Sequence, residues 1–464
     1  MFEKFANIFR IPDLRKRVLF MLAMMAVYRL GAFIPTPGVN AHALEQFFNS
    51  QSGSSLGLVN LFSGGNLRRL TVFALGIMPY ITASIIFQLL TVVYEPLRKL
   101  QNEGELGRKK ITQWTRYVTV GLGVVQSAAI AVALSHGSTG NKLVLDPGIG
   151  FILMTILTLT AGTTFVMWLG EQITDRGIGN GMSLLIFAGI VVGLPGGIED
   201  LVQTAQQSKF GAFTIPALVL LVLGMVAVVA FIVYVERSER RIPVQYAKRI
   251  VGRRLMGGQS THLPLRVNSG GVMPIIFAAS VLSAPLLFAN AAFVKNSDFL
   301  SRIATALQPG EPWYEFLYIV SIVFFAYFYI SIVFRPDDIA DNMRKYGGFI
   351  PGIRPGKKTS DFVNDILTRI TLVGAIYLCV VAIIPQFLIS GIHLNHLWLI
   401  GGLFERMPLW VTNGLGFNFY FGGTSLLIVV GVAMDTVNQI ESQLIMRHYE
   451  GFSQKSRARG RRAW

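Results

Sequence analysis

The sequence predicts an all-α membrane protein with ten transmembrane helices, and its composition and charge pattern support this prediction. Hydrophobic residues make up 52% of the 464 residues and charged residues 14%, whereas a soluble domain has about 25% charged residues. Apolar runs recur along the chain, most of them long enough to cross a bilayer as helices. The 41 Lys and Arg residues exceed the 25 Asp and Glu residues, which gives a formal net charge of +16, and most of the Lys and Arg residues fall in alternate loops. This clustering indicates the cytoplasmic loops of a membrane protein rather than a nucleic-acid-binding domain.

Ten apolar runs mark the expected helices, although the fifth is short enough to be a re-entrant segment. Without the fifth span, the basic loops after Val235 and after Phe334 would face outward, against the positive-inside rule. We therefore expect ten spans, with both termini in the cytoplasm, in an N-terminal half (1–205) and a C-terminal half (206–464). Five helices in each half is the count of an inverted repeat. The runs are Val18–Ile34, Thr71–Val93, Tyr117–Leu134, Phe151–Leu169, Met182–Leu194, Ile215–Val235, Gly270–Val294, Phe316–Phe334, Ile370–Ile389 and Phe417–Met434.

The stretch Asn60–Val93 joins a short glycine-containing segment to a long apolar one. Thr71–Val93 carries no charge and is long enough, at about 1.5 Å per residue, to span the bilayer as one helix. The residues before it form at most a turn or two and cannot span. Ile81 and Ile85 are four residues apart, so they share one helix face. That face is either packed against neighbours or lines a pore, and the spacing leaves both interpretations open.

Two basic loops are expected on the cytoplasmic side, at 236–271 and 335–365. The first contains β-branched and aromatic residues in partial alternation, which predicts a protruding pair of strands. The second begins with a helix pattern, which starts at Pro336 and ends at Gly347, and continues in a proline- and glycine-rich turn that holds Arg354 outward. Their positive charge either sets topology alone or binds phosphates or an acidic protein face.

Motifs for catalysis or for a cofactor fail on inspection. The GIRPGKKT loop has three residues between its glycines where a Walker A loop has four, and GIGNG at 177–181 has the wrong spacing for a dinucleotide fingerprint. His393 and His396 have no evident third metal ligand. Cys379 is the single cysteine, so there is no disulfide framework. We expect no cofactor, no metal and no enzymatic activity.

Several stretches together resemble the bacterial SecY family, over about residues 2–452. The resemblance implies two pseudo-symmetric halves around a central pore, in the bacterial inner membrane. It also implies a passive protein-conducting channel that translocates unfolded secretory polypeptides and releases signal or transmembrane helices laterally into the bilayer. The stretches are NLFSGGNLRR with FALGIMPYITASII, LGEQITDRGIGNGMSLLIFAGIVVGLP, ERRIPVQYAKR with VGRR, GGFIPGIRPGKKT and FYFGGTSLLIVVGVAMDT.

The resemblance also implies roles for individual residues. A plug, 60–69, would close the pore at a ring of isoleucines. Such an alkyl collar offers nothing that replaces the hydration of an ion, so it excludes ions and still yields to a polypeptide. Polar residues lie near a lateral gate, and arginines of the basic loops dock a motor or ribosome. The plug residues include Asn60, Leu61, Phe62, Ser63, Gly64, Gly65 and Asn66; the ring is Ile81, Ile85, Ile186, Ile276 and Ile428; the gate residues are Gln88, Gln126 and Ser280; the docking residues are Arg253, Arg254 and Arg354.

The implied partners are SecE and SecG in a heterotrimer, the SecA ATPase or the ribosome as the source of energy, signal peptides and preproteins, and membrane lipids. Ribosomal RNA would be contacted through the basic loops. The chain departs from the family in a longer outer insert, 391–416, expected as an interfacial helix, and in the lysines of PGKKT. Two other protein classes are alternatives: a secondary transporter needs polar groups at mid-depth, and a membrane enzyme needs convergent acid, base or metal ligands. The sequence shows few of the former and none of the latter.

Overall fold

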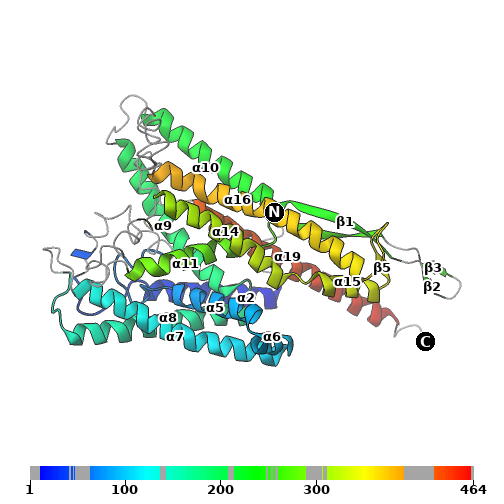
Figure 1. Cartoon of the computed structure of the whole chain (residues 1–464), viewed down its shortest axis with the longest axis horizontal. Coiled ribbons are helices and arrows are strands. Elements are labelled where there is room, and N and C mark those ends of the chain that lie inside the picture. Colours follow the sequence, from blue (N-terminus) through cyan, green and yellow to red (C-terminus); the bar gives the residue numbers. More distant parts are fainter. Residues whose placement is uncertain are drawn as a thin grey trace. The chain divides into compact units, whose positions relative to one another are not determined.

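The computed structural model describes residues 11–40, 43–44, 46, 63–135, 143–206, 214–246, 249–251, 254–256, 260–288, 306, 311–390 and 423–460. Long α-helices dominate these residues, and small antiparallel sheets accompany them (Figure 1). The chain forms two compact units. The first comprises Met1–Asp200, Ser283–Thr305 and Ile428–Trp464, and the second comprises Leu201–Leu282 and Ala306–Leu427. The expected division into halves at residue 205 stays a prediction.

Every predicted apolar run overlaps a helix in the described part of the chain, and the helical class is confirmed. By length and composition, five of the described helices can cross a membrane. The number is six if α5 (Met78–Val93) and α6 (Glu95–Asn102), which meet at a bend of 100°, form one span. The count of ten spans stays a prediction. The helices are α2 (Pro12–Gly31), α5 (Met78–Val93), α7 (Glu105–Ser135), α8 (Ile149–Arg176), α9 (Gly181–Gln206), α10 (Thr214–Arg237), α11 (Met273–Phe288), α14 (Pro312–Val333), α16 (Lys357–Ser390) and α19 (Gly423–Gly460).

The second helix is shorter than the predicted span over Thr71–Val93. Helix α5 begins only at Met78, and the residues before it fold as successive turns. Leu70 and Gly76 have φ angles of 40° and 54°, which a right-handed helix does not allow. Pro79 lies in the first turn of α5, where its missing N–H costs nothing. The prediction of one continuous helix from Thr71 was therefore wrong.

The first basic loop forms the predicted strand pair. Strand β1 (Glu239–Tyr246) pairs antiparallel with β4 (Ser260–Arg266), and β2 (Arg249–Val251) pairs with β3 (Arg254–Met256). Strand β5 (Gly348–Phe349) comes from the second basic loop and pairs with the other edge of β1, which gives the order β4-β1-β5. The two loops therefore share one sheet, which the sequence did not predict.

The second basic loop begins with the predicted helix, α15 (Pro336–Lys345). Acidic residues lie in its first turn and basic residues in its last, which complements the helix dipole. Gly347 follows with a φ of 73°, a conformation that glycine adopts at little cost and that ends the helix. The hydroxyl of Ser360 on α16 donates a hydrogen bond to Asp337 Oδ1 at 2.6 Å. This bond ties α15 to α16.

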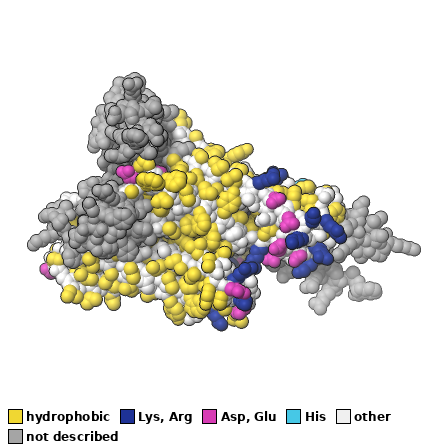
Figure 2. Space-filling model, viewed as in Figure 1, with side chains coloured by type: hydrophobic (Ala, Val, Ile, Leu, Met, Phe, Trp, Pro, Cys, Tyr) yellow, Lys and Arg dark blue, Asp and Glu magenta, His cyan; other side chains and the backbone are white. Residues whose placement is uncertain are grey.

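The surface separates apolar from charged side chains. Figure 2 shows broad hydrophobic areas over the helices and charged groups gathered near α15, the sheet and α6. Leu157 on α8 is 70% exposed and Phe316 on α14 is 57% exposed. Large apolar side chains that face outward on helices are expected where the surroundings are lipid.

Candidate functional site

All five isoleucines of the predicted ring are buried. They come from helices α5, α9, α11 and α19, and their exposed fractions lie between 0% and 6%. Four of them belong to the first compact unit, and Ile276 belongs to the second. Their convergence on one axis stays a prediction. The residues are Ile81, Ile85, Ile186, Ile276 and Ile428.

The segment before α5 is mostly buried from Ser63 onward, although Arg69 is exposed; Asn60, Leu61 and Phe62 lie outside the described residues. Ser63 is 0% exposed, and its Oγ accepts a hydrogen bond from the backbone N–H of Leu67 at 3.2 Å. Gly64 and Gly65 have φ angles of 70° and 82°, which suit glycine. The segment forms turns, as the sequence predicts, and its role as a plug stays a prediction.

Backbone hydrogen bonds fix the end of this segment nearest α5. The N–H of Thr36 donates to the carbonyl of Leu70 at 2.9 Å, and the N–H of Val72 donates to the carbonyl of Ile34 at 2.9 Å. Leu70 also joins a buried apolar cluster that includes Leu159 of α8. These contacts hold the chain after α2 against the chain before α5.

Two glutamines of the predicted lateral gate lie on α5 and α7, which pack against each other. Gln88 Nε2 donates to Ser84 Oγ of its own helix at 3.2 Å. Gln126 is 5% exposed. Within the described part of the chain, the Oε1 atoms of Gln88 and Gln126 are buried without a hydrogen-bond partner. Ser280 on α11 donates to Ile276 O at 2.7 Å, again within one helix. Unpaired buried carbonyls weaken the packing around them, and the gating role of these residues stays a prediction.

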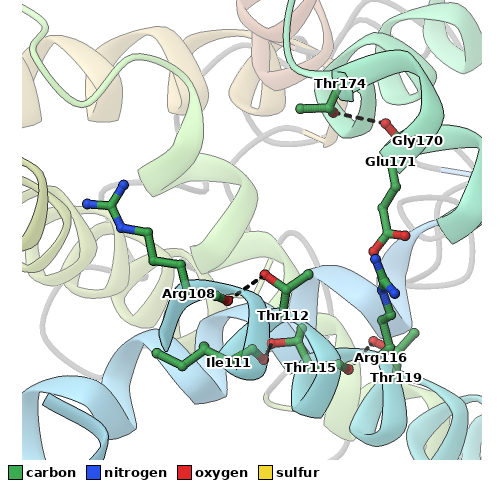
Figure 3. Close-up of polar contacts among 9 residues, drawn as sticks. All are labelled: Arg108, Ile111, Thr112, Thr115, Arg116, Thr119, Gly170, Glu171 and Thr174. Carbon is green, nitrogen blue, oxygen red and sulfur yellow. Dashed lines mark hydrogen bonds and ion pairs between the residues drawn. The ribbon is translucent and has the colours of Figure 1, made fainter. Parts of the chain in front are cut away.

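An ion pair that the sequence analysis missed joins α7 and α8 (Figure 3). Arg116 Nε lies 2.7 Å from Glu171 Oε1, and the Glu171 side chain is only 14% exposed. The threonines drawn beside it hydrogen-bond to carbonyls one turn earlier in their own helices, as Thr115 does to Ile111 at 2.9 Å. The two charges are 55 residues apart, so no local spacing could have indicated the pair.

The GIGNG loop is a structural turn, as predicted. The N–H of Gly179 donates to Gln439 Oε1 of α19 at 3.0 Å, and the N–H of Gly181 donates to Thr174 Oγ1 of α8 at 2.9 Å. Asn180 Oδ1 accepts from the N–H of Met182 at 3.0 Å and so caps the start of α9. The loop therefore joins α8, α9 and α19.

A family model described as SecY matches residues 71–437 of the chain. The protein translocase subunit SecY of Streptomyces griseus is 46% identical over 468 residues, which cover 97% of this chain and 100% of the relative. The chain belongs to the SecY family. It is therefore a multi-pass membrane protein that functions in protein transport. Members of the SecY family are not enzymes, in agreement with the expectation from the sequence.

Solved structures support the fold that SecY-family membership implies. A structure described as a protein-conducting channel is 16% identical, with a TM-score of 0.62 and 93% of each chain covered. Sec61 in the canine ribosome–channel complex from the endoplasmic reticulum is 16% identical, with a TM-score of 0.59 and 93% of each chain covered. At these identities the likeness concerns the fold, and it confirms the channel-type helical architecture.

Of the three arginines that the SecY resemblance implies for docking, the structure describes two, Arg354 and Arg254. Arg354 is exposed, and its carbonyl accepts a hydrogen bond from Thr359 Oγ1 at 3.0 Å. Gly352 and Gly356 beside it have φ angles of 82° and 106°, so the predicted turn around Arg354 is confirmed. Arg254 lies in β3, and Arg253 lies outside the described residues. The insert 391–416, with His393 and His396, lies outside them too.

Proposed function

We propose that this chain is the central subunit of a protein-conducting channel. Unfolded secretory polypeptides would cross the bacterial inner membrane through it, and signal or transmembrane helices would leave it sideways into lipid. The match to the SecY family over residues 71–437 carries this proposal. The burial of all five predicted ring isoleucines, at 6% exposure or less, supports it.

The resting channel is sealed by two apolar devices in this proposal. The isoleucine ring forms a collar whose alkyl groups cannot replace the hydration shell of an ion, so dehydrated ions do not enter. The plug, 60–69, fills the space next to the collar. A translocating polypeptide displaces both, because alkyl side chains impose no sequence requirement on the chain that passes.

Ten spans, in two five-helix halves at 1–205 and 206–464, surround the pore in this proposal. Gln88, Gln126 and Ser280 lie near the lateral gate. Both termini face the cytoplasm. SecE and SecG complete the complex, and no cofactor is required.

Energy comes from partners that bind the basic loops. SecA or the ribosome docks on 236–271 and 335–365 through Arg253, Arg254 and Arg354, with ribosomal RNA as a phosphate-rich contact. The ribosome-bound Sec61 that this chain resembles supports that assignment. The shared β4-β1-β5 sheet would present both loops together.

The proposal is tested by ion conductance in planar bilayers. Replacing the five isoleucines with serine should make the resting channel conduct ions, because hydroxyl groups hydrate the constriction. Ile85→Ser and Ile86→Ser form a matched pair on α5, since Ile85 is 1% exposed and Ile86 is 37% exposed. We expect added conductance from the first and none from the second. An assembled five-fold variant that stays ion-tight would contradict the collar.

A further inference from the structure

The segment that begins at Ser63 rests in a seat made by α2 and α9. Asn66 Nδ2 donates a hydrogen bond to the Tyr28 hydroxyl at 3.4 Å, and both residues are 3% exposed. Tyr28 lies on α2, and its ring stacks on Phe73 with 5.7 Å between the centroids. The stacked ring holds the hydroxyl in place, in surroundings where an unpaired carboxamide would be costly.

Gly189 of α9 makes the second contact of the seat. A Cβ atom at Gly64 would lie 2.6 Å from the Cα of Gly189, and a Cβ atom at Gly189 would lie 3.2 Å from the Cα of Gly64. The two backbones therefore meet with no room for a side chain on Gly64 and very little on Gly189. A Cβ atom at Gly189 would also lie 3.8 Å from the Tyr28 hydroxyl, so the polar contact and the glycine contact adjoin.

The two ends of the segment are held by different kinds of interaction. The end nearest α5 is fixed by backbone hydrogen bonds to Ile34 and Thr36, which do not depend on side-chain identity. The end at Gly64 and Asn66 is held by a side-chain hydrogen bond and a glycine contact. Gly189 is three residues from Ile186 on α9, so the two share a helix face. The seat therefore adjoins one member of the predicted ring.

We propose that Tyr28 and Gly189 are positioning residues that hold the segment in its resting place and set how often it leaves. This inference rests on the proposed function, in which that segment is the plug. Tyr28 supplies a polar latch for Asn66, and Gly189 supplies a notch that admits the backbone of Gly64. Weakening either contact raises the fraction of time that the segment is unseated, while the backbone anchor near α5 stays in place.

A cysteine reporter measures the unseated fraction directly. Ser63 is 0% exposed, so a Ser63→Cys thiol reacts with a maleimide only when the segment leaves its seat. Cys379, the single native cysteine, is replaced by alanine. The full chain is studied in membrane vesicles together with its partner subunits. We expect Tyr28→Phe to raise the labelling rate about two- to tenfold, the size of effect that the loss of one buried hydrogen bond produces. Gly189→Ala should also raise it.

Two matched control variants show whether removing a hydroxyl group or adding a methyl group away from the seat also changes the labelling rate. Tyr117→Phe removes a hydroxyl that accepts a hydrogen bond from Gln113 at 2.9 Å on an exposed face of α7. Gly196→Ala adds a methyl group on α9 where nothing lies within 4 Å of it. Both should label at the parent rate.

Each variant tests one of the two contacts of the seat. Labelling of Tyr28→Phe at the parent rate overturns the latch, and labelling of Gly189→Ala at the parent rate overturns the notch, whatever the ion conductance. If Gly189→Ala does not accumulate, Tyr28→Phe still decides, because it keeps the stacked ring. Faster labelling in vesicles that remain ion-tight supports the seat and counts against a sealing role of the plug, because the collar alone then keeps ions out.

Discussion

Gln126 illustrates how one polar side chain acts in an apolar helix. Its Oε1 is buried without a hydrogen-bond partner among the described residues, and its exposed fraction is 5%. Such an atom costs about 1–3 kcal/mol relative to one that is paired. Gln88 on α5 carries a second Oε1 that is buried without a hydrogen-bond partner among the described residues. Both glutamines belong to the predicted lateral gate, where less stable packing would ease opening.

The change Gln126→Leu is therefore expected to stabilise the protein. It removes the unpaired carbonyl and should raise the free energy of unfolding by about 1 kcal/mol, measured by chemical or thermal unfolding of the purified protein. Gln113→Leu is the control, because Gln113 lies exposed on the same helix. If Gln126 also lies at the lateral gate, membrane insertion of a signal helix should slow. A lower free energy of unfolding for Gln126→Leu would show that the Oε1 of Gln126 has a hydrogen-bond partner when the protein is in the membrane.

At the scale of elements, the basic loops depend on a sheet that neither loop makes alone. Strand β5 of the second loop adds to β1 of the first. A buried apolar cluster joins Ile242 of β1 and Leu265 of β4 to Val363 of α16. The turn that carries Arg354 follows β5 directly. The sheet and the glycine-containing turn fix the backbone at Arg354, a setting in which exposed loop residues often carry function; the docking role of Arg354 stays a prediction.

The change Arg354→Glu should leave membrane insertion intact, because the side chain is exposed. Motor-driven export of a preprotein into vesicles should fall about tenfold or more, since a like charge would then face the acidic surface expected on the partner. Lys110→Glu makes the same change of charge on an exposed residue of α7 and controls for net charge. Export at the parent level would remove Arg354 from the docking surface.

At the scale of the whole molecule, the distribution of charge predicts the orientation of the chain in the membrane. The net charge of +16 is concentrated in loops that a ten-span topology places on one side, and positive loops resist translocation. The outward-facing apolar residues of α8 and α14 suit lipid. Family membership and composition therefore agree on a multi-pass protein.

Reporter fusions test this topology. A phosphatase that is active only outside the cytoplasm should be inactive when fused within 236–271 or 335–365 and active within 391–416. A second reporter that is active only in the cytoplasm should give the opposite pattern, which controls for expression. Phosphatase activity at 236–271 would eliminate the fifth span and with it the ten-helix arrangement.

The sequence by itself determined the features that depend on neighbouring residues. Apolar runs long enough to form helices, the caps of α15, the strand pair of the first basic loop and the turn around Arg354 were all predicted, because periodicity, proline, glycine and charge act within a few residues. The family followed from motifs that are also local. Ring, plug and gate residues came from that resemblance.

Only the tertiary structure decided features that join distant parts of the chain. The late start of α5, the pair of Arg116 with Glu171, the addition of β5 to β1 and the seat formed by Tyr28 and Gly189 all depend on partners far away in sequence. The start of α5 is the clearest case: composition favours helix from Thr71, but hydrogen bonds to Ile34 and Thr36 hold the preceding chain in turns. Local propensity is worth a few tenths of a kcal/mol per residue, so a few long-range hydrogen bonds and close contacts outweigh it.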